Sequence, residues 1–194
     1  MGFTYRWQFV EDMATSITGS FYLTETITLP GSVATGARVQ GSIDLGAYVS
    51  VANSQAVAVE SVDFIYQTKL TGGSDVGQML DANGAITTQL TDLNPGTNLV
   101  VANNQSLIAS SGLNIDKTNS IASHATDLYP DNFGPASVSE AFMVVNDTMY
   151  LVAGPDGAGV LDDLLITVRI RCRIVKLSSK DWMAIAIQST ASDN

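Results

Sequence analysis

The stretch that decides the fold is LLITVRIRCRIVK, residues 164–176. Its even positions carry apolar side chains from Leu164 to Ile174, and most of its odd positions carry polar or charged ones. Alternation with a period of two places the apolar side chains on one face of a β-strand and the polar side chains on the other. At about 3.3 Å per residue such a strand is roughly 40 Å long. The stretch therefore predicts one long strand with a single buried face.

The segments around this stretch extend the same alternation. Residues 37–51 form a second long alternating run, in which a bend is expected near Gly41 or Gly46. A turn at 177–180, followed by alternation over 182–189, predicts a terminal hairpin. The shorter strand candidates are Phe3–Val10, Phe21–Leu29, Val57–Leu70, Ala85–Leu90, Leu99–Ala102, Val138–Val145 and Thr148–Ala153.

Helical periodicity is almost absent from the chain. One short helix is expected around Ser74–Ala82, and residues 103–135, which are poor in alternation, are expected to form a long connection. These patterns predict an all-β fold, a single jelly roll or β-sandwich of about eight core strands with extra terminal strands and little helix. With no internal repeat or linker, we expect one domain over residues 1–194, in which residues 1–12 are a candidate N-terminal strand or arm.

The composition argues against several classes of protein. Of the 194 residues 45% are hydrophobic, which suffices for a buried core, and the formal net charge is −10. This sign repels phosphate backbones, so direct binding to nucleic acid is not expected. No apolar run reaches the ~18 residues of a membrane span, and the first residues lack a signal-peptide pattern. Most acidic residues are aspartate and lysine is scarce, which favours solubility at high salt.

No group of residues has the pattern of an enzyme active site. The single histidine, His124, could meet Ser123 and Asp127, but a surface-loop histidine is the favoured interpretation, because neighbouring side chains on a loop seldom converge. Cys172 is expected in the core, since it lies on the apolar face of its strand. The weak candidates for binding a hard cation are Asp156, Asp162 and Asp163. We therefore expect no enzyme, no catalytic residue, and no cofactor or bound metal.

Two features are candidates for contact with another chain. The first is a row of alternate aromatic residues near the N-terminus, Phe3, Tyr5, Trp7 and Phe9. The second is a row of arginines on the polar face of the long strand, Arg169, Arg171 and Arg173. Each has an alternative explanation. The aromatic strand could complete the core of its own domain, and the arginines could pair across strands with acidic residues of the same chain.

The whole chain resembles the single jelly-roll major capsid proteins of haloarchaeal icosahedral viruses with an internal membrane, the sphaerolipovirus-like group. The resemblance rests on the length, on the Asp-rich and Lys-poor composition, and on the alternating strands at 37–51 and 164–175 followed by a hairpin at 181–189. It implies a structural subunit that assembles with copies of itself and with a second capsid protein into an icosahedral shell. It also implies a place in the virion close to the internal membrane, after assembly in the host cytoplasm, without a transmembrane segment.

A second hypothesis comes from another class of protein. It is a secreted or cell-surface β-sandwich that binds carbohydrate or mediates adhesion. Such a module needs aromatic side chains on an exposed platform, and the candidates are Tyr66, Tyr129, Phe133 and Trp182. A third hypothesis, an enzyme on a cupin-like jelly roll, is disfavoured because metal sites of that kind require several histidines.

Overall fold

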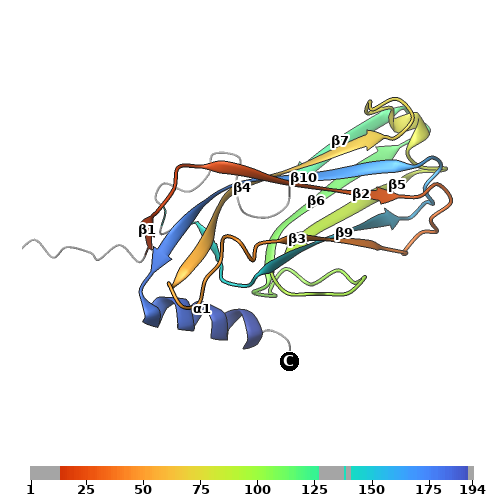
Figure 1. Cartoon of the computed structure of the whole chain (residues 1–194). Helices are drawn as coiled ribbons and strands as arrows, with labels where there is room; N and C mark the ends of the chain where they lie inside the picture. The colour runs from red at the N-terminus through yellow and green to blue at the C-terminus, as the bar shows by residue number, and fades with distance from the viewer. Residues whose placement is uncertain (1–13, 127–137, 139–140, 192–194) are drawn as a thin grey trace, which may run out of the picture.

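The computed structural model describes residues 14–126, 138 and 141–191, which form two antiparallel β-sheets packed face to face (Figure 1). The strands are β1 (Ala14–Ser16), β2 (Phe21–Leu29), β3 (Val39–Asp44), β4 (Gln55–Thr68), β5 (Gly84–Thr91), β6 (Leu107–Asp116), β7 (Ile121–Thr126), β8 (Phe142–Val144), β9 (Thr148–Asp156) and β10 (Leu164–Leu177). A 3-10 turn at Val76–Gln78 and the helix α1 (Ser179–Ala191) are the remaining described elements. The protein is an all-β sandwich, as the alternation predicts.

The strand pairs of the two sheets follow a nested order along the chain. The first sheet has the order β1-β10-β4-β8, with β2 also paired to β10, and the second has the order β3-β9-β5-β6-β7. Four of the pairs are nested along the chain, namely β2 with β10, β3 with β9, β4 with β8, and β5 with β6. The chain from β2 to β10 is thus a long antiparallel ribbon folded across both sheets.

The main core lies between the sheets. The even residues of β10 from Leu164 to Cys172 are buried, and so are the even residues of β4 from Val62 to Tyr66. They form one apolar cluster with residues of the second sheet, among them Leu151 of β9. The buried face predicted for the stretch 164–176 is therefore confirmed over most of its length.

An extra residue in β4 divides that strand between two cores. Along two consecutive residues of β10, the pairing moves from Ser61 to Val59, so Glu60 has no counterpart and forms a β-bulge. A bulge shifts by one the residues that face inward. Ala56 and Ala58 consequently face away from the main core and belong to a second apolar cluster.

The second cluster is covered by α1, where the sequence predicts the returning strand of a hairpin at 181–189. That prediction is wrong. Trp182, Ile185 and Ala186, which are spaced by three and then one residue, share one face of the helix and pack against the cluster. The segment forms a helix and not a strand because the helix buries these three side chains together against the cluster. Among the described residues, no helix has the length and apolar character needed to cross a membrane.

The start of α1 is fixed by reciprocal hydrogen bonds. The backbone N–H of Asp181 donates to the Ser178 hydroxyl oxygen at 3.1 Å, and the Ser178 hydroxyl donates to the Asp181 carboxylate at 2.6 Å. These bonds resemble a capping box and satisfy a backbone donor that the first turn leaves without a helical partner. Met183 and Ile187, which the sequence places on the buried face of a strand, are exposed on the helix.

The alternating run at 37–51 contains a shorter strand than predicted. β3 ends at Asp44, whose carboxylate accepts a hydrogen bond from the backbone N–H of Gly46 at 2.8 Å and turns the chain. The helix expected around Ser74–Ala82 is reduced to the 3-10 turn Val76–Gln78. In both places the sequence pattern is longer than the element that forms.

The segment 103–135, predicted as a connection, contains β6 and β7 in the part that the structure describes. The inward face of β6 includes the buried polar residue Ser111, which interrupts the apolar alternation. The strand expected at Leu99–Ala102 is a loop. The side-chain amide of Gln89 binds the backbone N–H and C=O of Val100 at 2.8 and 2.9 Å, and so takes the place of a neighbouring strand.

Candidate interaction surface

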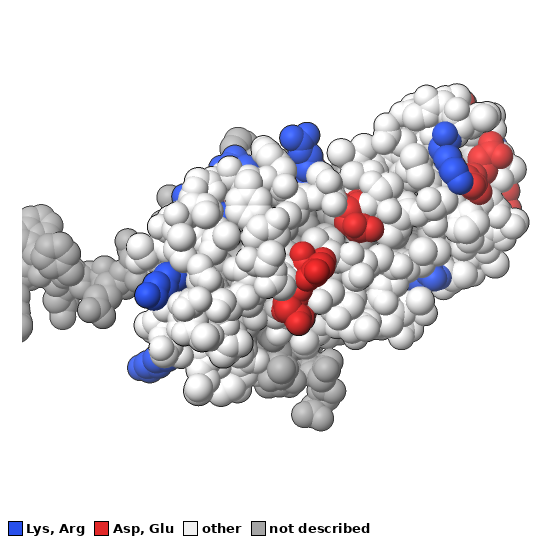
Figure 2. Space-filling view, in the orientation of Figure 1, with Lys and Arg blue, Asp and Glu red and all other residues white. Residues whose placement is uncertain are grey.

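The three predicted arginines lie together on the outer face of the first sheet. Arg169, Arg171 and Arg173 alternate with buried residues of β10, and β2 and β4 flank them on either side. Figure 2 shows that charged side chains are sparse on the visible face of the molecule and that uncharged residues fill most of the area between them. The row is therefore a local concentration of charge on a weakly charged surface.

Two of these arginines share one buried carboxylate. Glu60, the bulge residue of β4, is 4% exposed, and it accepts hydrogen bonds from Nε of Arg171, at 2.8 Å, and from Nε of Arg173. The Ser20 hydroxyl donates another at 2.8 Å. Burial raises the pKa of Glu60, but the hydrogen bonds from Arg171, Ser20 and Arg173 outweigh it and leave the pKa below its ordinary value. Pairing within the chain is thus present at two of the three arginines.

Arg169 has a different environment. Its guanidinium carbon lies 4.2 Å from the centre of the Tyr22 ring, which is a cation–π distance. The register places Arg169 opposite Asp63 of β4, yet none of the ion pairs among the described residues includes Asp63. Asp63 is exposed, so a carboxylate without an ionic partner in the described chain stands on this face.

Of the aromatic residues predicted to contact other molecules, the structure describes Tyr66 and Trp182. Phe3, Tyr5, Trp7 and Phe9 lie outside the described residues, and so do Tyr129 and Phe133. Tyr66 is buried in the main core, and Trp182 packs against the second cluster beneath α1. Neither Tyr66 nor Trp182 offers the exposed ring that an aromatic binding platform needs.

The candidate cation ligands take part in separate contacts. Asp156 pairs with Arg38 at 2.5 Å, and Asp163 pairs with Lys69 at 3.1 Å. Asp162 is exposed in the loop before β10. In the part of the chain that the structure describes, no three acidic, histidine or cysteine side chains are grouped to hold a metal ion. The three aspartates are therefore not brought together.

Cys172 lies in the main core, as its place on the apolar face of β10 predicts. Its side chain is fully buried. Burial, together with the negative charge of Glu60, raises the pKa of the thiol to about 12. The thiol is therefore protonated at neutral pH, whereas thiol reagents attack the thiolate.

We expect Cys172 in the folded protein not to react with a maleimide at pH 7, and to react once the chain is unfolded in urea. The physical reason is the combination of burial and a high pKa. Mass spectrometry of the labelled chain measures the result. Ser123→Cys is the matched control, since Ser123 is exposed on β7 and its replacement should be labelled at once in the folded protein. Equal labelling rates at both positions would contradict the burial of Cys172.

His124 is exposed, as the prediction of a surface histidine has it, but it lies in the strand β7 and not in a loop. Its Nε2 is 2.7 Å from the Ser111 hydroxyl of β6, and its ring meets the Tyr66 ring edge to face, with 5.4 Å between centres. Ser123 is on the opposite face of β7, and Asp127 lies outside the described residues. The hydrogen bond of His124 therefore joins two strands and does not form the grouping considered from the sequence.

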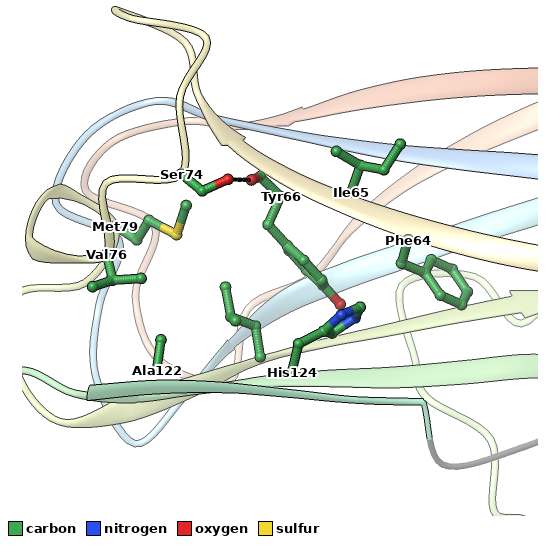
Figure 3. Close-up of a pocket in the computed structure, with 9 residues that line it drawn as sticks. Phe64, Ile65, Tyr66, Ser74, Val76, Met79, Ala122 and His124 are labelled. Atoms are coloured by element: carbon green, nitrogen blue, oxygen red, sulfur yellow. Dashed lines mark hydrogen bonds between the residues drawn. The ribbon is translucent and has the colours of Figure 1, made fainter.

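A cavity of about 430 Å³ lies between β4 and β7, the edge strand of the second sheet. Figure 3 shows Tyr66 reaching from β4 toward His124 of β7, with Val76 and Met79 at the other end of the space and Ala122 on β7. The cavity is lined by Phe64, Ile65, Tyr66, Ser74, Val76, Met79, Leu113, Ala122 and His124. Most of these side chains are apolar, so the cavity suits an apolar occupant that enters between the sheets.

A second buried acid was not expected from the sequence. Asp92, just after β5, is 2% exposed, and burial raises its pKa to about 7 despite hydrogen bonds from its own backbone N–H and from the Asn146 side chain. Its Oδ1 has no hydrogen-bond partner among the described residues. Neither Asp92 nor Glu60 stands out by motif, although Glu60 is a lone carboxylate in the apolar run 56–62.

Two places on the described chain are the candidates considered for contact with another molecule, the face that carries Arg169 and Asp63 and the cavity between β4 and β7. No family model matches the chain, and no curated protein matches it in sequence. Proposals about its function therefore rest on the fold and on these two places.

Proposed function

We propose that this protein is a structural subunit of an icosahedral viral capsid and that its sandwich is a single jelly roll. The observation that carries the proposal is the nested pairing of β2 with β10, β3 with β9, β4 with β8, and β5 with β6. A jelly roll needs this pairing, because it is an antiparallel ribbon wrapped into two sheets. The architecture recurs in viral capsids.

The composition of the chain supports assembly in concentrated salt. Only 14% of the residues are charged, and the net charge is −10. Uncharged surfaces lose little hydration energy when two copies meet, and salt screens the repulsion between like-charged subunits. We therefore propose assembly in the cytoplasm of a high-salt host, with copies of the same chain and a second capsid protein, into a shell close to an internal membrane.

The alternative function, a carbohydrate-binding or adhesive module, receives less support. It depends on an exposed aromatic platform, and the two candidates that the structure describes, Tyr66 and Trp182, are packed against the cores. The cavity between β4 and β7 has mainly apolar walls, whereas sugars present rows of hydroxyl groups. The capsid function is therefore the one that we put forward.

In size-exclusion chromatography with light scattering, the full chain is expected to form multimers, and a rise in salt from 0.1 M to 3 M should increase the assembled fraction. The physical reason is the screening of a net charge of −10 on each copy. Electron microscopy of the assembled fraction should show closed or curved particles. A monomer at every salt concentration that is also retarded on a polysaccharide matrix would instead favour the binding module.

A further inference from the structure

Among the described residues, part of β4 has a paired strand on one side only. β8 pairs with β4 over Val57–Val59, and further along the backbone carbonyl of Tyr66 accepts a hydrogen bond from Ser74. Between these positions β4 pairs only with β10 among the described residues. The cavity of about 430 Å³ adjoins this edge, since Phe64 and Tyr66 line it. A strand edge of this kind can receive one more strand from another chain.

Residues 3–9 have the pattern that this edge requires. Aromatic residues occupy the odd positions, and Thr4, Arg6 and Gln8 lie between them. In a strand, the four aromatic side chains share one face. A strand beside β4 points one face into the sandwich, where Phe64 and Tyr66 lie, and aromatic pairs between neighbouring strands stabilise such an addition.

Residues 3–9 cannot place all four of their aromatic side chains in the cavity of their own chain. β1 begins at Ala14, which pairs with Leu177 of β10, whereas Phe64 pairs with Val168. The stretch of β10 between those two partners is about 30 Å long. Trp7 and Phe9 lie seven and five residues before Ala14 and reach at most about 25 and 18 Å from it. A strand that brings all four aromatic side chains to the cavity therefore comes from a second copy.

Charge complementarity supports the same placement. Arg6 is on the opposite face from the aromatic residues, so in a strand added to β4 it lies on the outer face, where Asp63 is exposed. Asp63 is included in none of the ion pairs among the described residues. Its neighbour Arg169 stacks on Tyr22 instead. An arginine from another copy supplies the ionic partner that Asp63 lacks within the described part of the chain.

We propose that residues 3–9 of one copy add as a strand to the edge of β4 in a second copy, with their aromatic side chains in the cavity between β4 and β7 and with Arg6 beside Asp63. The inference rests on the proposed self-assembly, and it names the surface through which two copies join.

A charge-reversal cycle in the full chain tests the contact between Arg6 and Asp63. Arg6→Asp and Asp63→Arg should each lower the association constant about tenfold at 0.1 M salt, because each places like charges together. The double variant, which exchanges the two charges, should recover association to within about twofold of the original chain. Light scattering over a concentration series measures all four chains. A double variant that associates more weakly than either single variant would overturn the contact.

A synthetic peptide of residues 1–12 tests the cavity itself. The labelled peptide should bind the full chain, measured by fluorescence anisotropy, and an excess of it should reduce assembly. Ala122→Trp fills the cavity from β7 and should abolish peptide binding. Ser123→Trp, on the other face of the same strand, is the matched control and should bind the peptide as before. Equal binding by the two variants would show that the peptide does not enter the cavity.

The outcomes separate this inference from the proposed function. If the full chain assembles, yet neither charge reversal nor the peptide changes assembly, the strand addition is wrong and the capsid function stands. If the full chain is a monomer at every salt concentration, the capsid function fails. Peptide binding that Ala122→Trp abolishes and Ser123→Trp retains would still support the cavity as the site for residues 3–9.

Discussion

Replacing Glu60 with glutamine is expected to lower the free energy of unfolding by about 3 kcal/mol. The glutamine side chain has the same shape but carries no charge, and its amide N–H groups face an arginine where a carboxylate oxygen accepts a hydrogen bond. Glu60 is 4% exposed, so water cannot replace the lost interaction at that side chain. The side chains of Arg171 and Arg173 are 45% and 25% exposed and can turn to water, which keeps the loss at the lower end for a buried ion pair.

Urea denaturation followed by circular dichroism measures this effect. Asp63→Asn is the control, because Asp63 is an exposed acid on the same strand, and its replacement should change stability by no more than about 0.5 kcal/mol. If Glu60→Gln were as stable as Asp63→Asn, the cluster of Glu60 with Arg171 and Arg173 would contribute nothing to the fold. Contact with other chains would then be the role left for the row of arginines.

Replacing Asp92 with asparagine is expected to remove a pH dependence of stability. The pKa of Asp92 is raised to about 7, so the folded chain binds this proton more tightly than the unfolded chain does. Stability therefore falls as the pH rises from about 4 to about 7, by about 4 kcal/mol at most. Asparagine is neutral throughout, and its oxygen can still accept the hydrogen bond that Asn146 donates to Asp92.

Urea denaturation at pH 4, 5, 6, 7 and 8 follows the effect of Asp92→Asn. The variant and the original chain should be about equally stable at pH 4, and the variant should become increasingly the more stable up to about pH 7 and remain so at pH 8. Asp147→Asn is the control, because Asp147 is exposed close by and its replacement should leave the pH profile unchanged. A profile for Asp92→Asn that parallels the original chain would mean that Asp92 is ionised without cost in the fold.

Alternation predicted several strands of the main core, because these strands have one buried face, but it missed β6, whose inward face includes the polar residue Ser111. β2 has the predicted bounds Phe21–Leu29, and the stretch 164–176 forms β10 with one further residue. The arginine row was found for the same reason, since residues between buried positions must face outward. Its partner was not found. Glu60 meets Arg171 from 111 residues away along the chain, and the pairing of β4 with β10 alone decides which residue is extra.

The helix α1 could not be predicted from its own residues. Met183, Ile185 and Ile187 fit a strand, whereas Trp182, Ile185 and Ala186 fit one face of a helix. The helix forms because it buries Trp182, Ile185 and Ala186 against an apolar surface of the folded chain. That surface is built from β1, β4, β8 and β10 and depends on the bulge at Glu60. The cavity between β4 and β7 could not be predicted from the sequence either, since it depends on how the two sheets approach each other.

The central position of β10 bears on how the chain folds during synthesis. β5, β6 and β7 pair with near neighbours in sequence, so they can form a meander early. β2 and β4 instead pair with β10, which leaves the ribosome after them, and such long-range contacts form slowly. Until residue 164 emerges, the nascent first sheet lacks the strand that joins its parts. Closure of the sandwich is therefore a late event, and a chain truncated before β10 is expected to be a substrate for chaperones or proteases.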